Sequence, residues 1–217
     1  MVKIKFEANP HTIQNILCLG AHSDDIEIGC GGTVLKLAEQ YPDIRFKWVV
    51  FSASGERASE SSKSAQLFLH NVKHKDIVIK NFKDGFFPYS GNEIKEYFEL
   101  LKYEFSPDII LTHYGSDLHQ DHRMISDLTW NTFRNHLILE YETIKYDGDV
   151  GKPNFFVDLN YSECDKKIKY LLESFHTQKS KHWFTEDSFL SILRLRGIEA
   201  NAKGKYAEAY YCRKIVF

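Results

Sequence analysis

The sequence predicts an α/β fold with a mainly parallel sheet. Short apolar runs alternate with amphipathic segments along the 217 residues, and this alternation is typical of β-α-β units. Hydrophobic residues make up 43% of the chain and charged residues 27%, which favours a globular protein over a disordered one. Because no repeat or Pro/Gly-rich linker divides the chain, we expect residues 1–217 to form one domain.

The first part of the chain supplies four of the expected strands. The apolar run at residues 16–19 ends at Gly20 and is typical of a buried strand. Pro107 ends the third helix, because proline cannot continue a helix. We expect strands at residues 16–19, 46–51, 76–82 and 108–113, separated by helices at residues 31–40, 56–71 and 92–105, with Asn92 as the cap of the third helix.

The second part continues the same alternation. We expect helices at residues 123–135, 162–175 (capped by Ser162) and 185–200, and strands at residues 137–144, 155–159 and 206–217. Ligands of such sheets bind at the carboxyl ends of the strands. The segments after Leu19 and after Thr112 are therefore the expected place of a functional site.

Composition and charge exclude several classes of protein. The chain has 28 Lys+Arg against 30 Asp+Glu, whereas a nucleic-acid-binding protein usually has a basic excess, so we expect no nucleic-acid partner. No window approaches about 18 continuous apolar residues, so we expect no membrane span. The first ten residues lack the apolar core of a signal peptide. We expect a cytoplasmic protein whose four cysteines, none in a C-x-x-C pair, stay reduced.

Two polar motifs follow the strands at which a ligand is expected. AHSDDIE occupies residues 21–27 and precedes a Gly-rich segment, and HQDH occupies residues 119–122. His22 and Asp25 are close enough in sequence to reach one cation from a tight turn, and His122 can complete the set. Two histidines and one carboxylate fit zinc at a hydrolytic site, where a further position stays open for water. The sequence therefore predicts a metal site.

The same motifs contain side chains that could take part in a reaction. Asp24 adjoins Asp25 but should point elsewhere, and a spare carboxylate beside a metal-activated water is a natural general base. His119 could donate to an oxyanion or to the leaving group, with Asp121 holding its ring in the required tautomer. His113 ends a strand beside the site, where a supporting role and core packing are equally good interpretations.

A dinucleotide-binding turn is the main rival interpretation of the glycines in residues 29–32. Their spacing departs from G-x-G-x-x-G, and Asp24, Asp25 and Glu27 would repel a pyrophosphate. We therefore expect these glycines to let the helix pack closely on the sheet.

The two motifs resemble those of the PIG-L/LmbE family of zinc-dependent N-deacetylases. That family has A-H-P-D-D-x-E before a Gly-rich helix start, and H-x-D-H after a strand that begins with Pro-Asp. Ser23 replaces the proline here, which affects the backbone of the turn rather than a reacting group. Weaker matches extend the resemblance along the chain in the same order: Arg57–Glu60, Asp84-Gly85, His176–Gln178, Arg196-Gly197 and Tyr206–Tyr210.

The resemblance implies a Rossmann-like three-layer fold and a defined reaction. The family hydrolyses the acetamide of an N-acetylglucosamine unit, giving the free amine and acetate. The implied roles are zinc binding by His22, Asp25 and His122, proton abstraction by Asp24, assistance to the tetrahedral intermediate by His119 with Asp121, and substrate contact by Arg57, Asp84 and His176.

Two other functions stay open on the residues alone. A metal-dependent phosphoesterase would need more carboxylates and a second metal. A zinc-bearing carbohydrate-binding protein without catalysis would not need Asp24 and His119 beside the metal ligands.

The expected partner is a small N-acetylated sugar or sugar conjugate. Residues 179–214 contain eight Lys/Arg and four Asp/Glu, which would suit a phosphate-bearing substrate, although such an excess is usually a solvated face. Trp183 is among the aromatics that could stack on a sugar or nucleobase, although most aromatics are core residues. The sequence leaves open which sugar is used and whether the chain forms a homo-oligomer.

Overall fold

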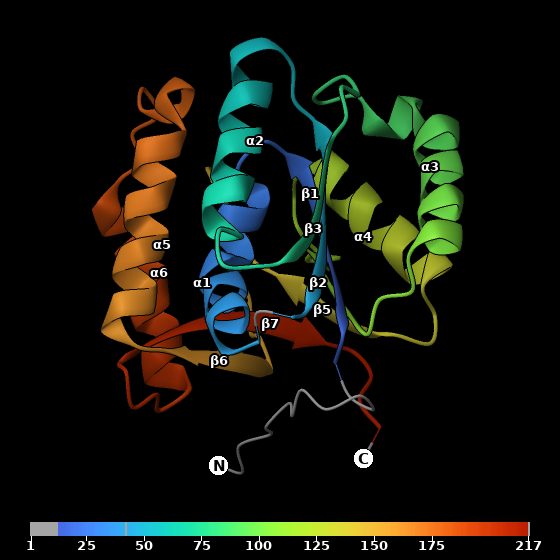
Figure 1. The fold of residues 1–217 in the computed structure, drawn as a ribbon. Helices are drawn as coiled ribbons and strands as arrows, with labels where there is room; N and C mark the ends of the chain where they lie inside the picture. Colours follow the sequence, from blue (N-terminus) through green and yellow to red (C-terminus); the bar gives the residue numbers. More distant parts are fainter. Residues whose placement is uncertain (1–12, 42, 217) are drawn as a thin grey trace.

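The structure, a computed structural model, describes residues 13–41 and 43–216 and is built on a seven-stranded sheet (Figure 1). The strand order is β3-β2-β1-β4-β5-β7-β6. All neighbouring pairs are parallel except those of β7, which runs antiparallel to both β5 and β6. The strands are β1 (Asn15–His22), β2 (Arg45–Ser52), β3 (His74–Ile79), β4 (Ile109–His113), β5 (Leu137–Tyr141), β6 (Phe155–Leu159) and β7 (Tyr206–Cys212). The prediction of an α/β fold with a mainly parallel sheet is confirmed.

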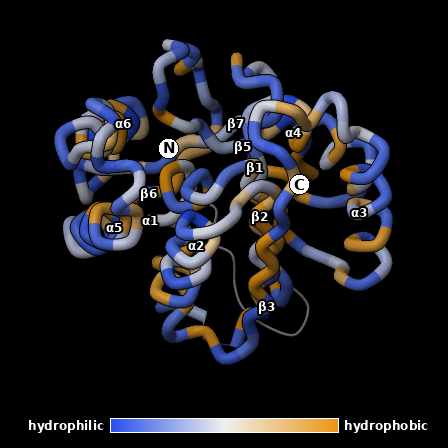
Figure 2. The backbone as a smooth tube through the Cα atoms, turned by 90° about the horizontal axis from the view of Figure 1, so that it is seen from above, coloured by the Kyte–Doolittle hydropathy of each residue, from blue (hydrophilic) through white to orange (hydrophobic). Residues whose placement is uncertain are grey.

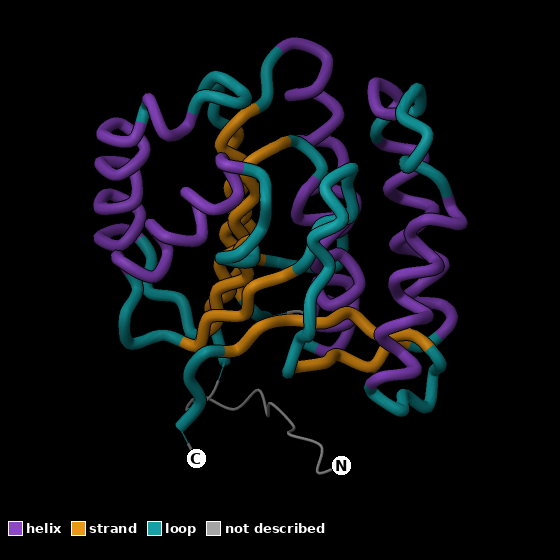
Figure 3. Tube along the Cα trace, turned by 180° about the vertical axis from the view of Figure 1, so that it is seen from behind, coloured by secondary structure: helices purple, strands orange, loops and turns teal. Residues whose placement is uncertain are grey.

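Helices cover both faces of this sheet, which gives three layers (Figures 1 and 3). Helices α1, α2 and α5 pack on one another on one face, with α6 against α5 and β7, and α3 and α4 cover the other face. The helices are α1 (Asp25–Gln40), α2 (Gly55–Phe68), α3 (Gly91–Glu104), α4 (Gln120–Thr132), α5 (Tyr161–Ser174) and α6 (Glu186–Glu199), with 3-10 turns η1 (Phe87–Tyr89) and η2 (His176–Gln178). Among the described residues, no helix is long and apolar enough to cross a membrane.

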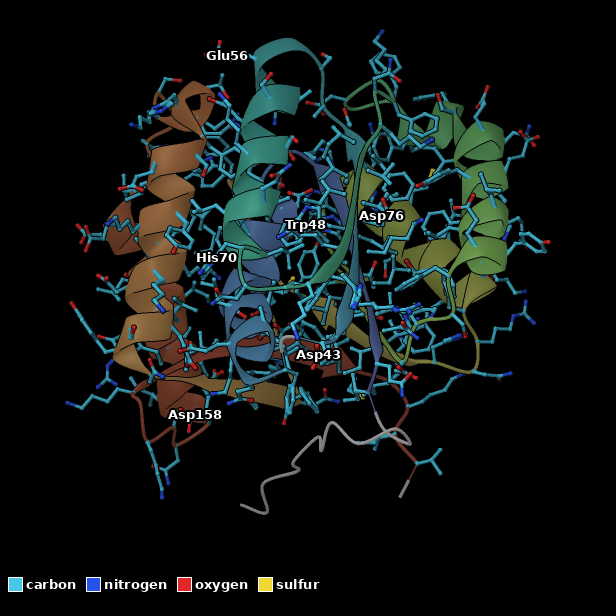
Figure 4. All side chains as sticks on the ribbon, viewed as in Figure 1. Asp43, Trp48, Glu56, His70, Asp76 and Asp158 are labelled. Carbon is cyan, nitrogen blue, oxygen red and sulfur yellow. The ribbon has the colours of Figure 1, made fainter. Side chains whose placement is uncertain are left out.

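The central strands are buried on both faces, as their continuous apolar runs predict. Ile16 and Cys18 of β1 pack in the core under α1 and α2, whereas Leu17 and Leu19 pack in the core under α3 and α4. Figure 2 shows the hydrophobic strand β2 between α2 and α3. Trp48 of this strand lies between the sheet and α2 (Figure 4), with its ring 6.4 Å from that of Phe68.

Two helices begin earlier than predicted, and this brings both motifs into helical first turns. Helix α1 begins at Asp25 rather than at residue 31, and α4 begins at Gln120 rather than at residue 123. The prediction left residues 25–30 in the turn that follows β1, but tertiary packing, which routinely overrides local propensity, extends the helix to Asp25. An added Cβ at Gly29 would lie 2.0 Å from Cδ2 of Tyr141, which confirms that a glycine permits close packing on the sheet.

Two of the predicted helix caps are wrong. The N-cap of α3 is Ser90, not Asn92. The N-cap of α5 is Asn160, not Ser162: its side chain accepts from the backbone N of Glu163, whose carboxylate accepts in return from the backbone N of Asn160. This reciprocal pair satisfies two helix-end donors at once, and a cap at Ser162 could not use Glu163 in that way.

A buried ion pair from two other elements, Lys167 of α5 and Glu208 of β7, forms hydrogen bonds with the backbone of α1. Lys167 Nζ donates to the backbone O of Ile28 at 2.7 Å, and the Glu208 carboxylate accepts from the backbone N atoms of Gly32 and Thr33 at 2.7 and 2.6 Å. Lys167 and Glu208 also contact each other at 2.6 Å. In a regular helix the Ile28 C=O accepts from the Gly32 N–H. Here each of these two groups also bonds to a side chain of the ion pair, so α5 and β7 fix the position of the first turns of α1.

Candidate active site

A pocket of about 240 Å³ lies beyond the carboxyl ends of β1 and β4. These two strands are neighbours at the point where the strand order reverses, which is where open α/β sheets bind ligands. His22 is the last residue of β1 and His113 the last residue of β4, and α1 and α4 begin shortly after each. The sequence-based placement of the site at these two strand ends agrees with the structure.

Three donor atoms from the two motifs meet at one point of this pocket. His22 Nδ1 lies 3.3 Å from Asp25 Oδ2 and 3.1 Å from His122 Nε2, and the last two atoms are 3.4 Å apart. Tetrahedral zinc with ligand bonds of about 2.0–2.1 Å separates its ligand atoms by about 3.3 Å. The triangle therefore has the size that three zinc ligands require.

The outer nitrogens of both imidazoles are engaged by carboxylates. His122 Nδ1 lies 3.0 Å from Asp117 Oδ2. His22 Nε2 lies 3.1 Å from Asp84 Oδ1 and 3.3 Å from Asp121 Oδ2. Such partners fix the proton on the outer nitrogen, so the inner nitrogen of each ring presents a lone pair to the centre.

Other combinations of nearby side chains could also hold a cation. They draw on His113, His119, Asp84 and Asp121, and each includes at least one histidine of the triangle. The set of His22, His119 and His122 shares both imidazoles with the triangle but lacks its carboxylate. Of these sets, only the triangle combines one carboxylate with two imidazoles that each have a further carboxylate on the opposite nitrogen.

Asp24 lies beside the triangle and lines the pocket, and its carboxylate does not cap the helix. It is the N-cap of α1 by position, but its side chain accepts no capping hydrogen bond. Oδ1 accepts from Ser23 Oγ at 3.4 Å and lies 3.8 Å from Arg57 Nη2. Burial and the charge of Asp25 raise the pKa of Asp24, which Arg57 and Lys181 partly offset. A carboxylate with a raised pKa is a better proton acceptor than an ordinary aspartate, as a general base requires.

His119 lies at the edge of the pocket as a neutral ring with a free donor. Its Nδ1 accepts from the backbone N of Asp121 at 3.2 Å, so we assign the proton to Nε2. Burial and the neighbouring charges of His122 and His22 lower the pKa of His119. The centroid of the His119 ring lies 4.8 Å from that of His22. A hydrogen-bond donor therefore lies next to the three candidate metal ligands His22, Asp25 and His122, which we call the donor triangle.

The Asp121 carboxylate contacts His22, and its support of His119 stays a prediction. The same carboxylate also accepts from the backbone N atoms of Gly85 and Phe87 at 2.7 and 3.1 Å. Only the backbone N–H of Asp121 reaches the His119 ring. Asp121 thus ties the 84–87 segment to the donor triangle.

The three expected substrate-contact residues divide into two that line the pocket and one that does not. Arg57 Nη1 lies 3.4 Å from Asp84 Oδ2, and both residues line the pocket. The hydrogen bond to His22 lowers the pKa of Asp84 to about 2. His176 is exposed in η2 and does not line the pocket. The next residue, Thr177, is anchored to the Glu60 carboxylate through both its backbone N and its hydroxyl.

His113 is a buried partner of the triangle rather than a ligand in it. Its ring stacks on His122 with centroids 3.9 Å apart, and its Nε2 lies 3.2 Å from Asp25 Oδ2. The backbone N of Ala21 donates to the same Nε2 at 2.9 Å. Burial and the charge of His122 lower the pKa of His113 to about 4, which keeps the ring neutral.

Sequence reasoning missed Asp117 and a whole wall of the pocket. Asp117 precedes the second motif by two residues, and an acidic residue so close to a predicted ligand is a usable signal. The wall comes from loops that carry no recognised motif. Its residues are Thr143, Ile144, Lys145, Tyr146, Asp147, Lys181 and Trp183.

The sequence model of the GlcNAc-PI de-N-acetylase family, PIG-L, matches residues 17–133, which is more than half of the chain. The chain belongs to the PIG-L family. All six residues of the donor triangle and its carboxylate partners fall within the match, as do Asp24 and His119.

Known proteins of this family and fold resemble the chain over most of its length. The diacetylchitobiose deacetylase of Thermococcus kodakarensis is 27% identical over 73% of this chain and 69% of its own. The structure of N,N'-diacetylchitobiose deacetylase from Pyrococcus horikoshii aligns with a TM-score of 0.68 at 22% identity, covering 92% of this chain and 84% of its own. The hydratase GalB from a Pseudomonas strain aligns with a TM-score of 0.73 at 16% identity, covering 94% and 98%. These structural likenesses establish the fold alone.

Proposed function

We propose that this protein hydrolyses the acetamide of an N-acetylated sugar of the N-acetylglucosamine type, giving the free amine and acetate. The observation that carries the proposal is the donor triangle of His22, Asp25 and His122, which has the spacing of zinc ligands and lies beside Asp24 and His119. The family match and the deacetylase relative support the choice of reaction.

We assign zinc to this triangle because two imidazoles and one carboxylate form its usual hydrolytic ligand set. Bound there, zinc would polarise the amide carbonyl and make a water molecule more acidic. Asp117, Asp84 and Asp121 hold the two imidazole ligands in the required tautomers.

The protein's own residues would then carry the protons. Asp24 accepts a proton from the attacking water, whose oxygen bonds to the acetyl carbon. His119 donates from Nε2 to the carbonyl oxygen as that oxygen becomes negative. When the carbon–nitrogen bond breaks, Asp24 returns its proton to the leaving nitrogen. The products are one acetate and one amine.

The paired Arg57 and Asp84 would hold the sugar ring. Together they offer guanidinium donors and carboxylate acceptors at the pocket wall, and a sugar hydroxyl can use both. His176 stays a prediction of the family resemblance, since its exposed position gives it no contact with this wall. The proposal treats residues 1–217 as one catalytic domain, because β7 near the C-terminus belongs to the same sheet as β1.

Acetate release after metal depletion and metal return would test the function. The purified protein is treated with a chelator, dialysed and reloaded with zinc, and acetate and free amine are measured on a panel of N-acetylated sugars. We expect equal amounts of both products, lost on chelation and restored by zinc. Release of phosphate from sugar phosphates without acetate would instead favour a metal-dependent phosphoesterase, and tight sugar binding without turnover would favour a binding protein.

A further inference from the structure

The pocket has a second wall, which supplies none of the proposed metal ligands or reacting groups. It is formed by residues 143–147, which follow β5, and by the loop before α6 that contains Lys181 and Trp183. Both segments lie outside the part of the chain matched by the family model, residues 17–133. Apart from Lys145, which contacts Asp117, and Lys181, whose charge acts on Asp24, this wall takes no part in the proposed hydrolytic step. It is therefore placed to recognise the rest of the substrate.

Lys181 is the cation of this pocket that forms no close ion pair among the described residues, although its charge acts on Asp24 from a distance. Arg57 contacts Asp84 and Asp24, and Lys145 lies 3.0 Å from Asp117 and close to Asp149. Lys181 is half-buried, and within residues 13–41 and 43–216 it forms no ion pair. Its ammonium lies 5.4 Å from the centre of the Trp183 ring. Asp147 adds one negative charge to the wall, but its side chain is exposed.

Two further polar groups of this wall are buried without a hydrogen-bond partner among the described residues. They are the Thr143 hydroxyl and the Trp183 indole N–H. Thr143 is only 5% exposed. A buried donor without a partner is costly, and most such groups in proteins are satisfied by a ligand, water or protein atom. Both residues line the pocket, although the two polar atoms themselves are shielded from solvent. A bound substrate would supply the missing acceptors after a side-chain shift that exposes them.

The same wall contains an exposed aromatic side chain, that of Tyr146. The Tyr146 side chain is 67% exposed, yet its ring is held from two sides. It stacks on His182 with centroids 5.1 Å apart and meets Trp183 edge to face at 6.4 Å. A large exposed ring fixed by its neighbours can stack on a flat group without first being ordered.

We propose that Lys181, Trp183, Thr143 and Tyr146 form a second subsite, which binds a phosphate group attached to the N-acetylated sugar. An ammonium, an indole N–H and a hydroxyl supply three kinds of donor, and a phosphate presents several oxygen acceptors to match them. Tyr146 lies where the group beyond the phosphate would emerge. The inference rests on the proposed deacetylase function, because it assumes that the sugar occupies the catalytic half of the pocket.

Substrates that differ only in the phosphate test this subsite. The zinc-loaded protein is assayed for kcat/KM on N-acetylglucosamine, N-acetylglucosamine 1-phosphate and UDP-N-acetylglucosamine. The Lys181→Met variant removes the charge and keeps the stem, Lys181→Arg keeps the charge, and Lys179→Met is the matched control on an exposed lysine outside the pocket.

We expect Lys181→Met to lower kcat/KM for both phosphate-bearing substrates by about tenfold or more, since it removes a charge-assisted hydrogen bond. Because Lys181 also acts on the pKa of Asp24, activity on the neutral sugar can fall too, and the expected result is a clearly smaller loss on the neutral sugar than on the two phosphate-bearing substrates. Lys181→Arg should retain most of the activity, and Lys179→Met should match the wild type. Tyr146→Ala should lower kcat/KM for the nucleotide sugar alone if the Tyr146 ring receives a base.

Equal kcat/KM of the wild type for neutral and phosphate-bearing sugars would overturn the subsite, as would equal losses of Lys181→Met on all three substrates. Calorimetric binding of glucosamine 1-phosphate and glucosamine separates this result from failure of the proposed function. If no substrate releases acetate, tighter binding of the phosphate form that depends on Lys181 still supports the subsite. Binding that does not depend on Lys181 rejects it.

Discussion

Asp24 precedes a helix but does not cap it, and this explains how one short motif can supply both a metal ligand and a base. The backbone N of His22 donates to Asp25 Oδ2 at 2.6 Å, so Asp25 fixes the turn. Asp24 is left with a buried carboxylate next to the Arg57 guanidinium. The two adjacent carboxylates therefore have different environments, and their pKa values shift in opposite directions.

Replacing Asp24 should separate chemistry from metal binding. We expect Asp24→Asn to lower kcat for acetate release by about 10²–10⁴-fold, the usual contribution of a general base. Zinc content, measured by atomic emission, should stay at the wild-type level, because the donor triangle is unchanged. His122→Ala is the contrasting variant and should lose the zinc itself. Near-normal acetate release by Asp24→Asn would rule out its role as the base.

Asp117 should control how tightly the metal is held, although it is not a ligand. Burial raises the pKa of Asp117, but the hydrogen bond to His122 and nearby positive charges lower it well below the usual range. We expect Asp117→Asn to weaken zinc binding by about 10–100-fold, the usual effect of removing a partner of a metal-bound histidine. Chelator competition measures this, with Asp127→Asn on the exposed face of α4 as the control. Unchanged affinity would show that His122 does not depend on Asp117.

The sequence pointed more directly to the candidate metal-binding and reacting residues than to those that would support them or recognise a substrate. His22, Asp24, Asp25, His119 and His122 lie in short dense motifs, where residue type and spacing alone restrict the chemistry. The contact of Asp121 with His22 rather than His119 depends on the path of the 84–87 segment, which lies more than thirty residues away in the chain. Lys181 and Trp183 belong to no recognisable sequence motif. The role that we propose for them becomes visible only in the structure, because both line the pocket.

At the scale of elements, α1 shows how distant segments hold a catalytic turn. Glu208 of β7 accepts hydrogen bonds from two backbone N–H groups of α1, and Lys167 of α5 donates to one of its backbone carbonyls. These groups belong to residues 28–33, just after the turn that contains Asp25. The sequence-based prediction began this helix only at residue 31 and so missed its first six residues, 25–30. A buried ion pair from other elements is a tertiary feature, which a short window of sequence does not reveal.

Breaking this ion pair should destabilise the protein. We expect Lys167→Met to lower the free energy of unfolding by about 3–5 kcal/mol, since it leaves the Glu208 carboxylate buried without its cation. Urea denaturation followed by circular dichroism measures the change. Lys169→Met, which affects an exposed pair with Glu173 on the same helix, should change stability by less than about 1 kcal/mol. Equal effects of the two variants would contradict a structural role for the buried pair.

For the molecule as a whole, the parallel order β3-β2-β1-β4-β5 explains why the site lies where it does. The strand order reverses between β1 and β4, so the connections that leave these two strands run to opposite faces of the sheet and leave a crevice between them. This much follows from the alternation of strands and helices. The antiparallel insertion of β7 between β5 and β6 does not, because an apolar run gives no strand direction. The likeness to a hydratase shows that the fold alone does not decide the reaction.

Zinc should stabilise the folded chain as a whole if it binds only the native arrangement. At a free zinc concentration of about 100 Kd, linkage predicts a gain of about 2.7 kcal/mol. For a chain of this length that gain raises Tm by about 5–10 °C. Differential scanning calorimetry with zinc and with chelator measures the shift, and His122→Ala should show almost none. A shift of the same size in that variant would place the zinc elsewhere.

The position of β7 also sets the order in which the two halves of the pocket can form. β6 has β7 as its sheet neighbour, and β7 is synthesised after all the other described strands. The strands that carry the donor triangle can pair earlier, while residues 147–183, which include β6 and lead to Lys181 and Trp183, wait for β7. Limited proteolysis of nascent chains halted before Tyr206 should cut within residues 147–183 and spare β1–β4. Equal protection of both regions would contradict this order.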